Sequence, residues 1–309
     1  MKEDKTLIIV GWGNQAQSWA CNLRDSHYPC KIYLRAGSHK ANFPVQQGLS
    51  TVKASQLAQY QNFALLIPDQ NHLEFLNKHQ DHLPKAAKII YAHGHSVHTL
   101  KLDQKFNQFE HLLLAPKSIA SAMRKDYLNQ QNIQAVFSTE HSQNPKQSES
   151  FLKELAAAIG IQNPYPVSFE EETCCDLFSE QSLLCGALPT LIEQNYNFLI
   201  QKGIPNHLAY LETWHEFFLI ADVLKAKGPK EFFKMISPNA LMGSQQYNQK
   251  YNKQETEKLM EELHREIKDG SFDQKIQKMS FKEIQNQVEE YWQQSPLQKM
   301  YQQMNESQS

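Results

Sequence analysis

The sequence lacks the features that mark several large classes of protein. The 309 residues contain no apolar stretch of membrane-spanning length and no cluster of Lys and Arg, and the formal charge is only −2. These absences disfavour a membrane protein and a nucleic-acid-binding protein. The five cysteines are odd in number and lack the spacing of a metal site. No signal-like leader precedes the first strand-like segment, so we expect a reduced, cytoplasmic protein.

Strand-like and helix-like segments alternate through the first half of the chain. Residues 6–10 form a continuous apolar run of the kind found in buried parallel strands. We expect strands at 6–10, 31–34, 63–67, 88–92, 111–115 and 133–137, and helices over 71–80 and 148–159. This alternation predicts an α/β domain whose parallel sheet is covered by helices on both faces.

The second half of the chain has a different pattern. From Phe169 onward it reads almost wholly as helix, with breaks near Gly203, Gly228 and Ser237. The change of pattern predicts two domains. The first, α/β domain spans 1–167, and the second, all-α domain spans 168–309.

A glycine-rich loop follows the first predicted strand. It has the form G-x-G-x-x-A, and its candidate cofactor-binding residues are Gly11, Gly13, Asn14, Gln15 and Ala16. After a first β-strand and before a helix, this pattern is typical of the pyrophosphate-binding turn of a dinucleotide-binding domain. The free N–H groups at the start of the helix would bind the anion.

The end of the second predicted strand bears on the choice of cofactor. A carboxylate there would bind a ribose 2′-hydroxyl, but the segment that follows the strand has none. Arg35 and Ser38, with His39 or Lys40 beside them, are instead suited to a 2′-phosphate. The sequence therefore favours NADP(H).

Two pairs of carboxylates stand out in the helical half. Asp176 and Glu180 form one pair, and Glu212 and Glu216 form the other. In an α-helix, residues four apart share a face, and like charges there repel. Both pairs lie among apolar residues, so a divalent cation is a better explanation than a solvated helix face. We expect Mg²⁺ at these four carboxylates.

Taken together, these motifs resemble ketol-acid reductoisomerase, also called acetohydroxyacid isomeroreductase, in its short form. The resemblance runs in order from about Leu7 to Phe272 and is thin over 41–62 and 128–168. The segments that carry it are 11–16, 34–38, 92–94, 115–117, 171–181, 184–186, 209–216, 236–240 and 267–272.

The resemblance implies a fold, an activity and a set of site residues. It implies an N-terminal Rossmann domain and a knotted, dimerising C-terminal domain. Two Mg²⁺ ions would be bound by the two acidic pairs, the second pair coming from a partner subunit. Ser237 would contact the substrate, and His93 and Lys117 would lie beside the nicotinamide and the metal site. The implied reaction converts 2-acetolactate or 2-aceto-2-hydroxybutyrate to the 2,3-dihydroxy acid in branched-chain amino acid biosynthesis.

The residues suggest how such a reaction would proceed on a 2-hydroxy-keto acid. Paired divalent cations act as Lewis acids on adjacent oxygens. Glu212 or Glu216 is suited to acid–base chemistry, and Lys117 to stabilising negative charge. His93 follows a strand, at the edge where open α/β sheets bind ligands. His215 is expected to point away from the metal-binding face.

The sequence departs from the family pattern beside Lys117. The family has Gly-Pro-Gly-His after its Ala-Pro-Lys, whereas this chain has Ser118-Ile119-Ala120-Ser121. Ser179 replaces a glycine, and Pro238-Asn239 follows Ser237. Two alternatives to the reductoisomerase therefore stay open: an NADPH-dependent reductase of another 2-hydroxy or 2-keto acid, and a non-catalytic NADP-binding protein.

Overall fold

The computed structural model describes residues 5–306. The chain divides into two compact units, the first ending at Cys175 and the second beginning at Asp176. The domain boundary at 167 stays a prediction, since helix α8 (Phe169–Ser179) begins in the first unit and ends in the second. Ser168 and Glu171 begin this helix as a capping box: the Ser168 Oγ accepts from the Glu171 N–H, and the Glu171 carboxylate accepts from the Ser168 N–H.

The first unit is built on one eight-stranded sheet with the order β3-β2-β1-β4-β5-β6-β7-β8. The strands are β1 (Leu7–Val10), β2 (Cys30–Tyr33), β3 (Thr51–Val52), β4 (Asn62–Leu65), β5 (Lys88–Tyr91), β6 (Glu110–Pro116), β7 (Ala135–His141) and β8 (Tyr165–Pro166). All six predicted strands are present, while the two-residue strands β3 and β8 were not predicted. The strand order reverses direction between β1 and β4, which is the switch point of a Rossmann-like fold.

The predicted all-parallel sheet is wrong at one strand pair, because β7 runs antiparallel to β6. Helix α6 (Ala120–Leu128) lies between these strands, and the Ser18 hydroxyl of α1 (Asn14–Asp25) donates to its first carbonyl at 2.7 Å. The chain thus stays at the carboxyl edge of β6 and re-enters the sheet from there. The Lys117 N–H donates to the Gln134 carbonyl at this turn. The sheet is therefore mixed.

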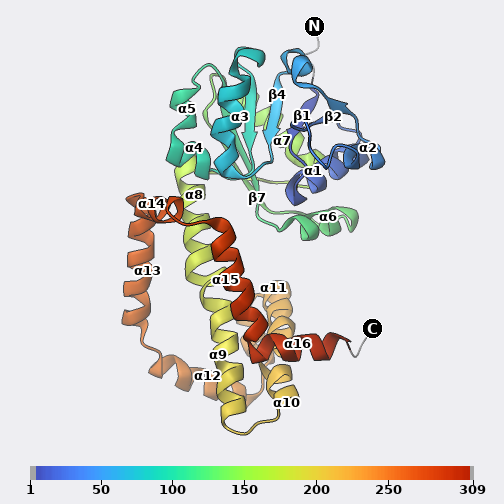
Figure 1. Cartoon of the computed structure of the whole chain (residues 1–309). Helices are drawn as coiled ribbons and strands as arrows, with labels where there is room; N and C mark the ends of the chain where they lie inside the picture. The colour runs from blue at the N-terminus through green and yellow to red at the C-terminus, as the bar shows by residue number, and fades with distance from the viewer. Residues whose placement is uncertain (1–4, 307–309) are drawn as a thin grey trace. The chain divides into compact units, whose positions relative to one another are not determined.

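Helices cover both faces of the sheet, as predicted (Figure 1). Alternate residues of β1 point to opposite faces, so Leu7 and Ile9 belong to one hydrophobic core and Ile8 and Val10 to the other. The first core contains residues of α1, α6 and α7 (Pro145–Ala158). The second contains residues of α3 (His72–His79), α4 (His95–Leu100), α5 (Leu102–Lys105) and α8. The short helix α2 (Phe43–Gln46) precedes β3.

The second unit contains only helices over its described residues. After α8 come α9 (Ala187–Gln201), α10 (Asn206–Tyr210), α11 (Glu216–Met235), α12 (Pro238–Lys250), α13 (Lys253–Lys268), α14 (Ser271–Gln277), α15 (Phe281–Gln294) and α16 (Pro296–Glu306). The three predicted breaks are confirmed. Gly203 and Gly228 have φ values of 84° and 75°, and Ser237 caps α12. None of the helices described is long and apolar enough to cross a membrane.

Helices α9 and α15 lie side by side in this unit (Figure 1). The buried Glu193 carboxylate on α9 accepts hydrogen bonds from Tyr291 and Ser295, each at 2.5 Å. The buried apolar core is small and consists of Tyr196, Ala209, Tyr210 and Leu297. Many large apolar side chains remain on the surface, so a single copy of this unit buries little of its apolar surface.

Candidate active site

The glycine-rich loop has the geometry that its motif predicts. Gly11 follows β1 with φ of 107°, and a Cβ there would lie 2.6 Å from Ile67 Cγ2 and 2.9 Å from the Leu66 carbonyl oxygen. Only glycine fits, because both the backbone angle and the close approach of β4 exclude a side chain. Gly13 is the N-cap of α1, and Ala16 is fully buried. Asn14 and Gln15 form the first turn of α1, where backbone N–H groups are available to an anion.

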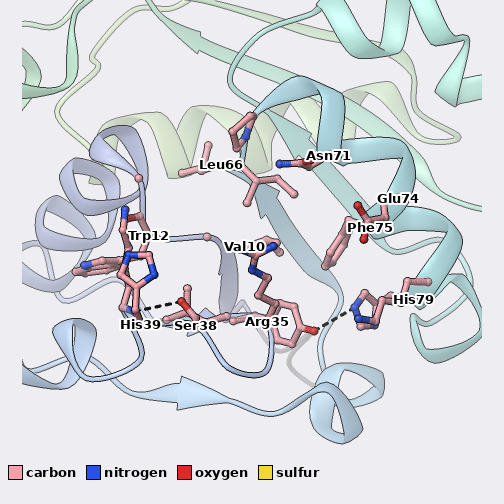
Figure 2. Close-up of a pocket in the computed structure, with 18 residues that line it drawn as sticks. Val10, Trp12, Arg35, Ser38, His39, Leu66, Asn71, Glu74, Phe75 and His79 are labelled. Atoms are coloured by element: carbon pink, nitrogen blue, oxygen red, sulfur yellow. Dashed lines mark hydrogen bonds between the residues drawn. The ribbon is translucent and has the colours of Figure 1, made fainter. Parts of the chain in front are cut away.

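A cavity of about 410 Å³ opens beside this loop, at the switch point of the sheet. Figure 2 shows the segment after β2, with Arg35, Ser38 and His39, on one side, and Asn71 and Glu74 on the other. The Lys40 ammonium, which also lines the cavity, donates to the Trp12 carbonyl at 3.3 Å. Of the predicted cofactor-binding residues, Gly11, Gly13, Arg35 and Ser38 line this one cavity of ligand size, whereas Asn14, Gln15 and Ala16 do not.

Several other side chains of the cavity were not predicted from the sequence, among them Glu74 and His79. Glu74 lines it from α3, whereas the dinucleotide-binding motif concerns only the glycine-rich loop and the end of β2. The Nε2 atom of His79 and the Tyr33 hydroxyl share a hydrogen bond of 3.1 Å (Figure 2). Burial lowers the pKa of His79 below its ordinary value, and the nearby Lys78 and His82 lower it further. His79 is therefore neutral at pH 7, and the positive charge of the cavity comes from the Arg and Lys side chains.

A second group of residues gathers where β5 and β6 end. The Gly94 N–H donates to Glu172 Oε2 at 2.7 Å, and Lys117 Nζ lies 2.7 Å from Glu172 Oε1. The Glu172 side chain is completely buried, whereas that of Lys117 is 37% exposed. A buried carboxylate needs such partners to offset its loss of hydration. Lys117 is therefore held in a fixed position by Glu172.

Gly94 allows this close approach. A Cβ at Gly94 would lie 2.8 Å from the Phe169 carbonyl oxygen, 2.8 Å from Thr173 Oγ1 and 2.9 Å from Glu172 Oε2. Helix α8 thus packs directly on the Gly94 backbone. Glu172 lies within the segment 171–181 that carries the family resemblance, but it was not predicted to be a site residue. Its position four residues before Asp176, on the same helix, was the signal that could have identified it.

His93 lies beside this group, two residues after the end of β5. Its Nδ1 atom accepts a hydrogen bond from the His95 N–H at 3.1 Å. In the neutral imidazole the proton must therefore be on Nε2. The structure places His93 and Lys117 at the ends of neighbouring strands, as the sequence predicted.

The altered segment after Lys117 forms the start of α6. Ile119 is the N-cap residue, and its side chain is 76% exposed. The Ser18–Ala120 hydrogen bond holds the first turn of α6 against α1. With Ser118-Ile119-Ala120-Ser121 in place of the family's Gly-Pro-Gly-His, Lys117 is still bonded to Glu172, and an exposed isoleucine lies two residues after it.

The two acidic pairs lie in helices that are not regular α-helices, which corrects the prediction. A π-helical turn spans Glu180–Leu184, and a second spans Leu211–His215. Such wide turns often occur at functional sites. Gly186 closes the first turn, and a Cβ there would lie only 2.0 Å from the Gln181 carbonyl oxygen. The α-helical period that placed His215 away from the acidic face does not apply inside the second turn.

The four carboxylates are accessible in the single chain. Glu180, Glu212 and Glu216 are exposed, and Asp176 is half-buried. Within the described part of the second unit, no three of these carboxylates bring ligand atoms within 4.8 Å of one another. Their apolar neighbours are also on the surface, including Leu183 (54% exposed), Leu184 (53%), Leu211 (38%) and Ile220 (37%). One chain thus does not bring three of the four carboxylates together at one metal-binding point.

Ser237, the predicted substrate contact, has a local structural role. Its Oγ atom accepts a hydrogen bond from the Ala240 N–H at 3.2 Å, and Pro238 occupies the first helical position of α12. The side chain is exposed. Its predicted contact with substrate stays a prediction.

Comparison with known proteins agrees with this arrangement. Residues 1–164 match the family model described as acetohydroxy acid isomeroreductase, NADPH-binding domain, and residues 169–308 match that of ketol-acid reductoisomerase, C-terminal domain. A ketol-acid reductoisomerase (NADP(+)) of Helicobacter pylori is 33% identical over 274 residues, which cover 85% of this chain and 81% of that protein. One from Helicobacter acinonychis is 32% identical over the same length.

A solved structure of similar fold is that of an NADH-preferring ketol-acid reductoisomerase from an uncultured archaeal source. It is 21% identical to this chain, with a TM-score of 0.86, and the likeness covers 98% of this chain and 94% of that one. At this identity the likeness concerns the fold alone.

Proposed function

The chain belongs to the ketol-acid reductoisomerase family and is an NADP-dependent oxidoreductase of branched-chain amino acid biosynthesis, and we propose that its substrate is 2-acetolactate or 2-aceto-2-hydroxybutyrate. The observation that carries this proposal is the group formed by Gly94, Lys117 and Glu172 beside His93. It keeps the catalytic lysine in place although the segment that follows it has changed.

We propose that two Mg²⁺ ions are held by Asp176, Glu180, Glu212 and Glu216. Four carboxylates provide the hard oxygen ligands that Mg²⁺ prefers, and their positions in and next to two π-helical turns support a shared role. When bound, the ions would act as Lewis acids on the ketone and hydroxyl oxygens of the substrate.

We further propose that the second acidic pair of each metal site comes from a second copy of the chain, in an intertwined and knotted dimer. The single chain supports this proposal, since no three of the four carboxylates bring ligand atoms within 4.8 Å of one another among the described residues. So do the exposed apolar residues around both π-helical turns and along α11, which include Phe218, Leu219 and Leu224. An apolar surface of this extent is typical of a permanent subunit interface.

The protein side chains have distinct tasks in this reaction. Lys117 would stabilise the negative charge that develops on the substrate oxygens during alkyl migration and reduction. Its hydrogen bond to the buried Glu172 fixes the ammonium group before substrate arrives, so little reorganisation is needed. Glu212 or Glu216 would transfer the proton of the substrate hydroxyl. His93, with its proton on Nε2, offers a hydrogen-bond donor near the reacting groups, and Ser237 would contact the substrate carboxylate.

The test is turnover of 2-acetolactate with NADPH and Mg²⁺, followed by the loss of NADPH absorbance. The rearranged 2-keto acid serves as a second substrate that needs reduction only. We expect turnover of both. Turnover of neither, by protein that binds NADPH, would refute the proposed substrate.

Shared metal sites can be tested by mixing two inactive variants, Asp176→Asn and Glu216→Gln. A mixed dimer has one site with both defects and one site with neither, so partial activity should return after subunit exchange. Activity that stays absent although mixed dimers form would contradict the shared site.

A second candidate function is reduction of a 2-keto acid without the isomerase step. The exposed Ile119 favours it, because this side chain stands two residues after Lys117, in the segment where the family has Gly-Pro-Gly-His. Turnover of the rearranged 2-keto acid but not of 2-acetolactate would establish this alternative.

A further inference from the structure

One acidic side chain stands out in the cavity beside the glycine-rich loop. Of the described residues that line this cavity, Glu74 is the only one that carries a carboxylate. It lies on α3 and is exposed. Within residues 5–306, the Glu74 carboxylate takes part in no hydrogen bond or ion pair. A carboxylate on the wall of a cavity that binds an anionic cofactor repels the cofactor, unless it accepts a hydrogen bond from it.

The phosphates of the cofactor are expected away from this wall. Arg35 and Ser38 line the cavity from the segment after β2, where the 2′-phosphate would lie, and the pyrophosphate would lie at the glycine-rich loop. Figure 2 shows Glu74 on the other side of the cavity, close to Phe75. The carboxylate therefore faces a part of the cofactor other than its phosphates.

The part of the cavity between these two sides suits the adenine base. Adenine is attached to the ribose carbon next to the one that carries the 2′-phosphate, so it enters the cavity beside Arg35. Leu66, Ile67 and Phe75 line the cavity there and offer apolar surface to a purine ring. The base has one group that donates hydrogen bonds, the exocyclic N6 amino group. Glu74 is the acceptor for such a donor on the α3 wall.

Lys78 makes a carboxylate acceptable in this position. It follows Glu74 by one helical turn and lines the same wall of the cavity. Its positive charge reduces the repulsion between the Glu74 carboxylate and the phosphates of the cofactor. The wall thus provides an acceptor for the base without excluding an anionic ligand.

We propose that Glu74 is a specificity-determining residue that accepts a hydrogen bond from the N6 amino group of the cofactor's adenine. The inference rests on the proposed function only for its cofactor site and not for its substrate. An ionised carboxylate can only accept, so it gains nothing from a base that has no donor at this position. A site built around such a hydrogen bond discriminates against a ligand that lacks the donor.

The test compares two dinucleotides by calorimetry in the absence of substrate: NADP⁺ and its analogue with unsubstituted purine in place of adenine. The analogue differs only in the missing amino group. We expect the wild-type protein to bind NADP⁺ about tenfold more tightly than the analogue, because a hydrogen bond to a charged group is lost. Glu74→Ala should weaken NADP⁺ binding by about tenfold and change the affinity for the analogue by less than about twofold.

Two further variants separate the hydrogen bond from the charge. Glu74→Gln keeps an acceptor oxygen without the charge, so it should still prefer NADP⁺ to the analogue by about threefold or more. Asp81→Asn is the matched control, because Asp81 follows α3, is exposed and does not line the cavity. It should bind both dinucleotides as the wild-type protein does. Glu74→Ala should also weaken NADH and NADPH by the same factor, since both carry adenine.

The outcomes that overturn the inference are distinct. Tighter binding of NADP⁺ by Glu74→Ala would mean that Glu74 only repels the phosphates. An equal loss for NADP⁺ and the analogue would assign Glu74 to a ribose hydroxyl, and a wild-type protein that binds the two equally would exclude recognition of the amino group.

The proposed substrate is judged by a different measurement. Failure to turn over 2-acetolactate would refute the substrate, and the titrations would still decide the role of Glu74. A wild-type protein that binds no NADP⁺ would overturn the cofactor site and this inference together.

Discussion

Replacement of Gly94 by alanine should disrupt the candidate active site through a single methyl group. The added Cβ would lie 2.8 Å from the Phe169 carbonyl oxygen and 2.8 Å from Thr173 Oγ1. Neither atom is the end of a flexible side chain, since one is backbone and the other belongs to a β-branched residue. Helix α8 must therefore move away from the β5 loop.

The size of the effect follows from these distances. The neighbours must retreat by about 0.6 Å to reach the 3.4 Å of ordinary contact. Such overpacking costs about 1–3 kcal/mol of folding free energy. The same movement lengthens the hydrogen bond from the Gly94 N–H to Glu172, and with it the position of Lys117 changes. A shift of this size should lower kcat by about tenfold to a hundredfold.

The measurement combines steady-state kinetics, urea unfolding and NADPH titration of Gly94→Ala. NADPH affinity should stay near the wild-type value, because the glycine-rich loop is formed by other residues. Gly243→Ala is the matched control, since no heavy atom lies within 4 Å of the Cβ it would add. If Gly94→Ala had wild-type kcat and stability, α8 would not pack on Gly94 as described, and the account of Lys117 would be wrong.

Three further predictions concern the cofactor, the metal and pH. Arg35→Asp should weaken NADPH binding by about tenfold or more and affect NADH much less, because it removes the cation next to the expected 2′-phosphate; equal loss for both cofactors, in calorimetry, would contradict this. Asp176→Asn and Glu216→Gln should each abolish Mg²⁺-dependent turnover with NADPH affinity intact, and unchanged Mg²⁺ affinity would return these carboxylates to ordinary surface groups. Burial lowers the pKa of His111 to about 4, so below about 6.5 the unfolded chain binds a proton that the native protein does not, and stability falls as pH falls. His111 alone should contribute a loss of about 2 kcal/mol between pH 7 and pH 5, and urea unfolding of the wild-type protein and His111→Gln should differ by that amount in their pH dependence.

The parts of the fold that were predicted correctly are those with a local cause. The apolar runs of β1, β4 and β5 and the turn at Gly11 are visible in consecutive residues, so their strands and the loop could be located. The direction of β7 could not, because it depends on where α6 packs. The contact between Ser18 and Ala120 that keeps α6 at the edge of β6 joins residues 102 positions apart. No periodic pattern of apolar and polar residues in the sequence indicates such a contact.

The candidate site shows the same division. Arg35, Ser38 and Lys117 could be singled out because each lies in the segment that follows a strand, at the edge where ligands bind. Glu74 and Glu172 come from helices, and only the folded chain brings them to that edge.

The π-helical turns show why a spacing of four residues was informative and yet incomplete. A π-helical turn accommodates one extra residue per turn, and the pattern of apolar and polar residues does not reveal it. Both turns have a side chain that donates to the backbone carbonyl four residues earlier: Gln181 to Leu177 at 3.1 Å, and Thr213 to Ala209 at 2.7 Å. Bonds of this kind also occur in the regular helices of this chain, for example from Thr190 to Gly186 at 2.9 Å, so they do not by themselves explain the wide turns. The π-helical turn itself occurs twice, next to each acidic pair, on two separate helices. Because π-helical turns are rare and frequent at functional sites, this repetition supports the proposal that the two pairs serve one kind of site.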